Sequence, residues 1–449
     1  MGEANQQDRI TIDALFTGYP FPNFLEPIEE RAREFEELHP RYRIKVGSFY
    51  FQNLGEEISK ATLEGRPPTM ASYYTGATQI ARDTLKADGT PLFTSVEKAI
   101  GGRTEILGHP VVLDDIITAC RDFYTIDGTV AAMPLSVSTM HLYTNVTLLK
   151  AAGVTEIPRT WGEIEAACRA VAELEDGPSH GISWANDGKF FQQAMAQLGA
   201  RLVDHDNGRD GRATTVDLTS PEMLAYVTWW HRMHQDGHYL YTGKVEDWEG
   251  SFKAFADQQV VFRLSSSFDG PYMVKAGQDG GFEVAVTPTP YSDDFPRAGN
   301  WIGGDGIWLA DGLDKETEDG ALAFMQYLNT PANVGKWHKS FGTSPVTNGA
   351  IALLESEGWF DGEHAYHRAT VEQLKATDGT PGASAALLGH FAQIQHAMMN
   401  AMEDVMGRGA DPVARFTQAS AEATRLLDDY GAHCLATGPR PAHCLVVDS

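Results

Sequence analysis

The sequence predicts an α/β protein of two lobes joined by hinge strands, and three observations lead to this fold class. The chain has 449 residues, more than one hydrophobic core usually organises. Predicted strands and helices alternate, as in a parallel sheet covered by helices. Stretches rich in glycine, proline and small residues cross between blocks at residues 131–139, after residues 282–291 and at residues 342–351. Three crossings indicate lobes whose sequences interleave, because one crossing would suffice to join consecutive domains.

The first block supplies three predicted strands. Residues 10–16 and 42–49 alternate apolar and polar side chains, which is the pattern of a strand with one buried face. Residues 69–75 form a third, shorter strand. With a helix predicted in each interval, this order favours a parallel sheet.

Two helices separate these strands. The stretch at residues 24–40 places its apolar side chains on one helical face, at Leu25, Ile28, Ala32, Phe35 and Leu38. The second helix, at residues 56–63, ends before Gly65 and a pair of prolines, because a C-terminal glycine and a following proline end helices.

Later segments repeat the alternation. After the hinge strand at residues 131–139, Thr160 and Glu163 have the spacing of a capping box, so a helix begins there. A second α/β block leads to a glycine-punctuated strand at residues 299–310. Residues 316–341 are helical on both sides of a central breaker.

Composition excludes several classes of protein. The net charge of -26 repels phosphate backbones, so we expect no nucleic-acid partner. No stretch approaches the roughly 18 uninterrupted apolar residues of a membrane span, so we expect a soluble chain. The first ten residues lack a basic and apolar signal segment. This absence is not evidence for a cytoplasmic location.

The four cysteines offer no CxxC motif, so a zinc or redox motif has little support. Cys120 and Cys168 each lie in a helical pattern, whereas Cys434 and Cys444 are close together in an irregular tail. The latter pair is either free or bridged. A bridge would contribute on the order of 3 kcal/mol by loop entropy and would imply an oxidising compartment.

Other motifs favour structural roles over chemistry. His231, His234 and His238 are close in sequence, but a helix terminus explains them better than a metal site. The acidic stretch from Asp204 lacks the glutamate that closes a calcium loop, so it favours an Asn-Gly turn. GxSxG, Walker and GxGxxG motifs are absent from the sequence, and we expect no cofactor and no metal.

Residues 131–164 resemble a stretch of the extracellular solute-binding proteins of carbohydrate ABC importers, the group that includes maltose-binding protein. Pro134 lies on the hinge strand, Tyr143 and Asn145 follow, a helix ends at Ala152-Gly153, and Thr160-Trp161 begins the next helix. The similarity covers nearly the whole chain and is closest to the glycerol-3-phosphate-binding and glycerophosphodiester-binding proteins. Matching segments in the same order are DKET (314–317), FMQYLNTPANVGKWH (324–338), SPVT (344–347), ESEGWF (355–360) and GHFAQIQ (389–395).

The resemblance implies the periplasmic-binding-protein fold, class II-like, with interleaved lobes that close on a ligand by hinge motion. Lobe one would comprise residues 1–132 plus 290–342, and lobe two residues 133–289 plus 343–449. The implied protein is an extracytoplasmic monomer, periplasmic or lipid-tethered at the cell surface, and not an enzyme. Its partners are a small-molecule carbohydrate or polyol and the permease subunits of an ABC transporter.

A cleft that holds a polar solute needs aromatic faces for a sugar ring and fixed hydrogen-bonding groups for its hydroxyls. Segments that match the ligand-contacting loops of the family supply both. The candidate ligand-binding residues are Tyr19, Phe21, Tyr73, Tyr74, Thr75, Ser136, Ser138, Trp184, Asn186, Asp187, Ser266, Ser267, Asp269, Trp301, Gly303, Gly304, Asp305 and Thr343. For each aromatic residue alone, a core or surface position is an equal alternative.

The sequence departs from the glycerol-3-phosphate binders at informative positions. Thr343 stands where they have a tyrosine, and Leu387 and Gln395 stand near the place of an arginine. A phosphate in a dry cleft needs charge-assisted donors such as arginine. Asp305 replaces a small neutral residue, and its carboxylate would repel phosphate while accepting hydrogen bonds from vicinal hydroxyls. We therefore expect a neutral sugar, oligosaccharide or polyol.

Two alternatives stay open. The cleft could take a zwitterionic glycerophosphodiester such as glycerophosphocholine, because aromatic rings can cage a quaternary ammonium. A glycoside-processing enzyme is the competing class, since Asp187, Asp269 and Asp305 could supply the two carboxylates that such chemistry needs.

Overall fold

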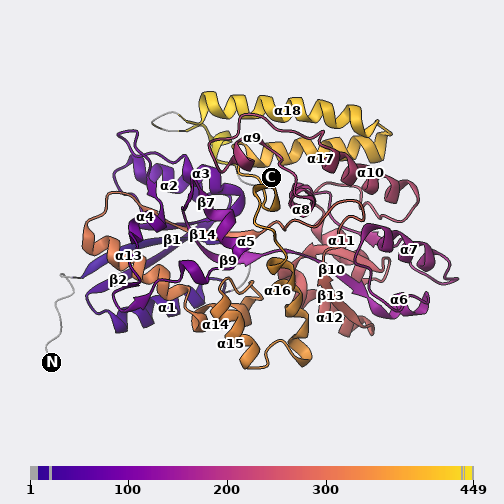
Figure 1. Ribbon diagram of the computed structural model, residues 1–449, viewed down its shortest axis with the longest axis horizontal. Coiled ribbons are helices and arrows are strands. Elements are labelled where there is room, and N and C mark those ends of the chain that lie inside the picture. The colour runs from indigo at the N-terminus through magenta and orange to yellow at the C-terminus, as the bar shows by residue number, and fades with distance from the viewer. Residues whose placement is uncertain (1–8, 20–22, 436–437, 439, 447–449) are drawn as a thin grey trace.

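The computed structural model describes residues 9–19, 23–435, 438 and 440–446. Two β-sheets lie in separate α/β lobes, and the chain passes between them more than once (Figure 1). The two-lobed α/β fold predicted from the sequence is confirmed.

The first sheet has six strands. Its order is β2-β1-β3-β14-β4, and β9 pairs with β14 beside that path. β1 is parallel to β2 and β3, whereas β14 is antiparallel to β3, β4 and β9. The strands are β1 (Ile10–Gly18), β2 (Tyr42–Tyr50), β3 (Met70–Tyr74), β4 (Phe93–Thr94), β9 (Met133–Ser138) and β14 (Gly303–Ala310).

Helices cover this sheet (Figure 1), and two short hairpins belong to the same part of the chain. The helices are α1 (Glu26–Leu38), α2 (Leu54–Leu63), α3 (Thr78–Arg82), α4 (Val96–Ile100), α5 (Thr118–Tyr124), α13 (Lys315–Leu328), α14 (Pro331–Phe341) and α15 (Asn348–Ser356), with 3-10 turns η2 (Thr75–Ala77) and η3 (Leu113–Asp115). The hairpins are β5 (Glu105–Ile106) with β6 (His109–Pro110) and β7 (Thr125–Ile126) with β8 (Thr129–Val130).

The helical face predicted for α1 is largely confirmed. Ile28, Ala32 and Phe35 are buried against the sheet and α13. Leu38 differs, with 60% of its surface exposed. It is the last residue of α1, where the helix has passed the edge of the core.

The second sheet has four strands in the order β11-β12-β10-β13. They are β10 (Met140–Asn145), β11 (Ile182–Ser183), β12 (Phe262–Ser266) and β13 (Val284–Pro288). The helices of this part are α6 (Val146–Ala151), α7 (Trp161–Ala172), α8 (Gly188–Leu198), α9 (Asp204–Gly208), α10 (Pro221–Gln235), α11 (Trp248–Ala256), α12 (Gly270–Gly280), α16 (Arg368–Lys375), α17 (Phe391–Arg408) and α18 (Pro412–His433). Its 3-10 turns are η4 (Ser267–Asp269), η5 (Gly362–His367), η6 (Pro381–Ala383) and η7 (Ala442–Leu445).

Local signals in the sequence correspond to observed element ends. The capping box of Thr160 and Glu163 forms at the start of α7. α10 carries His231 and His234 in its last turns and ends at Gln235. α9 is a left-handed turn, in which three consecutive residues before Gly208 have positive φ, rather than an ordinary helix.

The first crossing between the sheets lies at Thr139, between β9 and β10. We expected the second lobe to begin at residue 133, and β9 instead pairs with β14 in the first sheet. The second crossing connects β13 to β14. The third runs beside the first, where the amide of Ser344 donates to the carbonyl oxygen of Val137 at 2.7 Å. α15, which follows this crossing, packs on α14.

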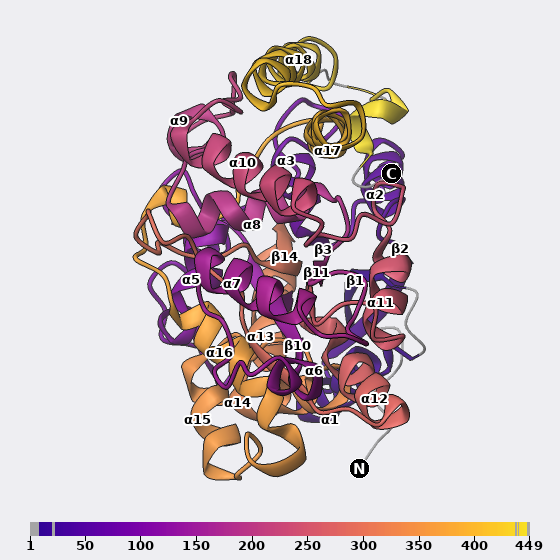
Figure 2. The same ribbon diagram turned by 90° about the vertical axis from the view of Figure 1, so that its right-hand side faces the viewer.

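α17 and α18 pack side by side at one end of the molecule (Figure 2). α18 also reaches α3 of the other lobe, where the hydroxyl of Tyr430 donates to Asp83 at 3.1 Å. Cys434 and Cys444 form a disulfide, which resolves the alternative left open by the sequence. Within the described residues, no helix combines the length and the apolar character that crossing a bilayer demands.

Candidate interlobe binding site

The site lies where the ends of several strands of the first sheet meet. β1 and β3 are parallel, so their carboxyl ends lie at the same edge, and β14 begins there because it runs antiparallel to β3. Asp305 on β14 is in register with Tyr74 on β3 and with Ser136 on β9. In open α/β sheets, ligands bind at such carboxyl edges.

Asp305 places a buried carboxyl at this edge. Its residue surface is 1% exposed, and the hydroxyl of Tyr19 donates to its Oδ1 at 3.0 Å. Burial raises the pKa of the Asp305 carboxyl to about 7, although hydrogen bonds from Thr17 and Tyr19 oppose the rise. The carboxyl therefore changes its charge near neutral pH.

Several hydroxyls near Asp305 are buried without a hydrogen-bond partner in the described chain. They belong to Tyr124, Ser136, Thr75 and Ser344. Burial raises the pKa of Tyr124 well above its ordinary value, and the charge of Asp305 adds to this rise. Buried polar groups are usually hydrogen-bonded, so a group of partnerless hydroxyls indicates a place where a ligand or water binds.

The backbone of β14 approaches β9 unusually closely at Gly304. Its φ is 93°, a conformation that favours glycine. A Cβ at Gly304 would lie 1.7 Å from the carbonyl oxygen of Ser136. This glycine thus permits the pairing that places Ser136 opposite Asp305.

The second sheet meets this edge at the first crossing. The amide of Thr139 donates to Oγ of Ser267 at 3.2 Å, and the Thr139 hydroxyl donates to the carbonyl oxygen of Trp301 at 3.1 Å. The Trp301 ring and the hydroxyl of Ser138 lie next to Gly303. Predicted site residues from both lobes are therefore held together at the crossing.

A pocket of about 440 Å³ opens between the lobes beside the crossing at Thr139. It is lined by Phe24, Phe268, Pro271, Tyr272, Lys339, Ser340, Phe341, Gly342, Trp359, His364, Tyr366 and His367. The Phe24 ring packs edge-on against Tyr19 with centroids 5.1 Å apart, which connects the pocket wall to the partner of Asp305. We call this space the interlobe pocket.

The cationic groups near the interlobe pocket have acidic or aromatic partners. Lys339 pairs with Glu357 and lies 5.2 Å from the Trp359 ring centroid. Arg263, in the neighbouring strand β12, is buried and pairs with Asp269 at 2.7 Å. Burial lowers the pKa of His367 to about 3, so this ring is neutral at pH 7.

Several predicted residues lie away from this edge. The Trp184 ring is packed in an aromatic core against Trp229, Trp230 and Tyr239. Tyr73 follows Ser72 on β3 and packs against Phe93, on the opposite side of the strand from Tyr74.

The remaining polar candidates have partners of their own. Asn186 donates to the carbonyl oxygen of Met399 at 2.9 Å. Asp187 caps α8 and accepts from the indole of Trp248 at 2.9 Å. Oγ of Ser266 accepts from the amide of Phe268 at 3.2 Å.

The carbonyl oxygen of Thr343 is 2.6 Å from Nδ1 of the buried His338. Phe21 lies outside the described residues.

Sequence reasoning did not select Tyr124, Phe24, Phe341, Trp359 or Tyr366. Phe24 and Phe341 lie next to expected helix ends, and Trp359 lies in the ESEGWF segment already noted for its resemblance. Their aromatic character was visible in the sequence, but the tertiary contacts that gather them were not.

Comparisons with known proteins show the family of the chain. Residues 30–365 match the family model described as bacterial extracellular solute-binding protein. The sn-glycerol-3-phosphate-binding periplasmic protein UgpB of Salmonella typhimurium is 25% identical over 391 residues, which cover 84% of each chain. UgpB of Escherichia coli K12 is 24% identical over 413 residues, 89% of each chain.

Solved structures share the fold. The cyclic alpha-maltosyl-1,6-maltose binding protein of Arthrobacter globiformis has a TM-score of 0.76 at 18% identity, covering 94% of this chain and 100% of that one. UgpB of Mycobacterium tuberculosis in complex with glycerophosphocholine has a TM-score of 0.66 at 17% identity, covering 93% and 98%.

Proposed function

Because this chain belongs to the family of bacterial extracellular solute-binding proteins, we propose that it captures a neutral sugar, oligosaccharide or polyol between its lobes. It is a solute-binding protein of an ABC importer. In our proposal it acts as an extracytoplasmic monomer and delivers the closed complex to the permease subunits.

The lobes expected from the sequence are residues 1–132 plus 290–342 and residues 133–289 plus 343–449, and we propose to move the first boundary from residue 132 to Thr139. Pairing of β9 with β14 supports placing the first hinge at Thr139, after the strand rather than before it. Closure would rotate the two sheets about this point and about the third crossing, which is hydrogen-bonded to it through Ser344.

We infer the class of ligand from the buried Asp305 carboxyl, which lies beside buried hydroxyls that have no hydrogen-bond partner in the described chain. A carboxylate accepts two or more hydrogen bonds from vicinal hydroxyls, and hydroxyls such as those of Tyr124 and Ser136 can both donate and accept. A phosphate at the same edge would meet the negative charge of Asp305, while Arg263 is already paired with Asp269. These features favour an uncharged, polyhydroxylated ligand.

The proposed contacts in the first lobe are Tyr19, Tyr74, Ser136 and Asp305. Rings of the interlobe pocket such as Trp359 and Tyr272 would cover the apolar face of a sugar. We leave Trp184 out of the contact set, because its ring is enclosed by other aromatic side chains.

Glycerophosphocholine is the second candidate, and the aromatic lining of the interlobe pocket favours it. Rings such as Trp359, Tyr272 and Phe341 suit a quaternary ammonium through cation–π attraction. The solved complex of the Mycobacterium tuberculosis protein with glycerophosphocholine supports this candidate by analogy of fold.

A glycoside-processing role would need two carboxylates flanking one bond. Asp187 is engaged by Trp248 and caps a helix, and Asp269 pairs with Arg263. These partners leave Asp305 as the carboxyl best placed at the proposed site, which supports binding over hydrolysis.

Calorimetry with maltotriose, glycerol, glycerophosphocholine and sn-glycerol 3-phosphate tests the proposal. We expect a neutral compound to bind, and Asp305→Asn to weaken it about 10–100-fold, the worth of a hydrogen bond to a charged group. The matched control Asp311→Asn changes a half-exposed aspartate that pairs with Lys86, and it should leave affinity unchanged. Binding of glycerophosphocholine alone would overturn the preference for a neutral polyol.

A further inference from the structure

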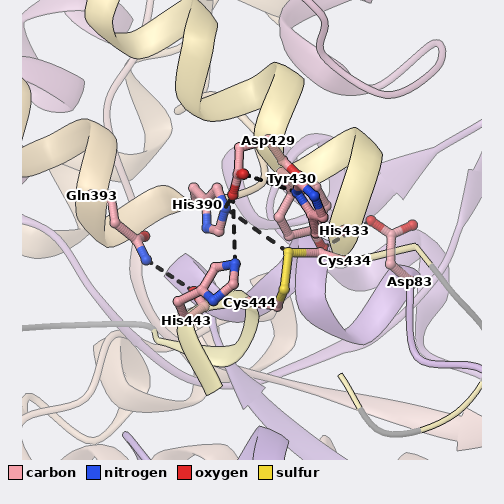
Figure 3. The surroundings of a disulfide bond; sticks show 9 residues. All are labelled: Asp83, His390, Gln393, Asp429, Tyr430, His433, Cys434, His443 and Cys444. Carbon is pink, nitrogen blue, oxygen red and sulfur yellow. Dashed lines mark hydrogen bonds and ion pairs between the residues drawn. A yellow bond between two sulfur atoms is a disulfide. The ribbon is translucent and has the colours of Figure 1, made fainter. Parts of the chain in front are cut away.

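A second group of chemically competent side chains lies far from the interlobe pocket, around the C-terminal disulfide. His390 precedes α17, Asp429 and His433 lie in the last turns of α18, and His443 lies in η7 (Figure 3). Three imidazoles converge on the one carboxylate of Asp429. The solute-binding role of the chain makes no use of this group.

Its distances are those of a metal-ligand set. Nε2 of His390 lies 3.0 Å from Oδ2 of Asp429, and Nε2 of His443 lies 3.5 Å from the same oxygen. Zinc bonds to nitrogen and oxygen are about 2.0–2.2 Å, so two ligands of a tetrahedral ion are about 3.3–3.5 Å apart. The His443 separation lies within this range, and the His390 separation is about 0.3 Å shorter.

The third side of the triangle joins His390 and His443. One ring nitrogen of each of these histidines lies within 4.8 Å of the other. His443 is half-exposed and sits in a short turn, so its side chain can rotate to adjust this separation. His390 is nearly fully buried and provides the fixed point.

The other oxygen of Asp429 is held separately. Nδ1 of His433 lies 2.9 Å from Oδ1, leaving Oδ2 directed at His390 and His443. Outer hydrogen bonds of this kind orient ligating carboxylates in metal sites. Asp429 is also partly exposed, which provides a path for an ion from solvent.

The disulfide positions the third ligand. The bond between Cys434 and Cys444 fixes η7, and with it His443, against the end of α18. Sγ of Cys434 lies 3.9 Å from Nε2 of His390, but in the oxidised protein this sulfur is bonded to Cys444 and is not a thiolate ligand. The set available to an ion is thus two imidazoles and one carboxylate.

We propose that His390, Asp429 and His443 bind one divalent transition-metal ion of the zinc type, with a fourth position open to water. Two imidazoles and a carboxylate are a ligand set that zinc accepts. The ion would join α17, α18 and η7, and so tie the C-terminal tail to the second lobe. The tail in turn contacts the first lobe, where Arg440 donates to the hydroxyl of Thr84 at 2.8 Å.

The test uses the full chain with its disulfide intact, freed of metal by a chelator and titrated with Zn²⁺ against a chromophoric competitor. We expect one Zn²⁺ per chain, and a loss of affinity of at least 100-fold in His443→Ala and in Asp429→Asn. Both side chains are about half exposed, so both variants should fold, and circular dichroism verifies this. Co²⁺ should give the intense visible bands of a tetrahedral site.

The matched control is His234→Ala, since the chain has 15 histidines and one of them elsewhere could bind Zn²⁺ adventitiously. His234 lies in α10 near two other histidines, and its replacement should leave the Zn²⁺ affinity unchanged. Fewer than one Zn²⁺ bound per chain at saturation would overturn the proposal. So would Zn²⁺ binding that survives both His443→Ala and Asp429→Asn.

Discussion

Replacing Asp305 by asparagine should change how the stability of the protein depends on pH. The carboxyl has a pKa of about 7 in the folded chain, because burial disfavours its charged form, against about 3.9 in an unfolded chain. Between these values the folded chain binds a proton that the unfolded chain does not. The contribution of this group to stability therefore rises as the pH falls from 8 to 5, by about 3 kcal/mol.

The assay is urea unfolding of wild type and Asp305→Asn at pH 8 and pH 5. Asparagine keeps an acceptor for Tyr19 but does not titrate, so the variant should lack this component. Histidines with lowered pKa, such as His141 at about 3 and His338 at about 4, act in the opposite direction, since they lose stability as the pH falls. They occur in both proteins and cancel in the difference. A difference under about 1 kcal/mol would refute the reasoning.

The same carboxyl couples ligand affinity to pH. A neutral polyol that donates hydrogen bonds to Asp305 prefers the ionised form, which predominates only above pH 7. Its affinity should rise about tenfold between pH 6 and pH 8. An anionic phosphate ester would show the opposite trend, so calorimetry at the two pH values separates the ligand classes.

Other predictions concern the core, the interlobe pocket and the crossing. Trp184→Ala should lower the free energy of unfolding by about 3–5 kcal/mol, as for other buried tryptophans, and urea unfolding measures this loss. Trp359→Ala should weaken ligand binding about tenfold in calorimetry, with circular dichroism to verify folding because the ring also stacks on His364; full affinity would remove the ring from the site. Gly304→Ala should destabilise by more than about 2 kcal/mol in urea, because its φ is 93° and its Cβ would meet a backbone carbonyl. Replacing Cys434 and Cys444 by serine should cost about 3 kcal/mol in urea, the entropy of a loop of ten residues.

Elements with strong local signals were predictable from the sequence. The alternating pattern at residues 10–16 corresponds to β1, and the capping box at Thr160 corresponds to the start of α7. The break near Pro331 separates α13 from α14. The capping box and the break depend on residues a few positions apart, and the strand is recognised by its own alternating pattern, although it pairs with distant strands.

The site was harder to predict, because its geometry depends on pairing between distant segments. Asp305 and Tyr19 are 286 positions apart and meet only when β14 inserts beside β3. Trp184 illustrates the opposite outcome. A tryptophan after a strand is compatible with a cleft or with a core. The rings of α10 that enclose Trp184 are far from it in the sequence.

Burial at the interlobe edge also supplies a physical reason for closure to depend on ligand. The hydroxyls of Thr75, Tyr124, Ser136 and Ser344 are buried without a hydrogen-bond partner from the described chain. Each buried hydroxyl without a hydrogen bond costs about 1–3 kcal/mol, so closing on an apolar or empty space would cost several kcal/mol. A polyhydroxylated solute restores these hydrogen bonds only when both lobes surround it. The closed state is then favoured by the differential affinity of the ligand for it, which is the condition for a ligand-driven hinge.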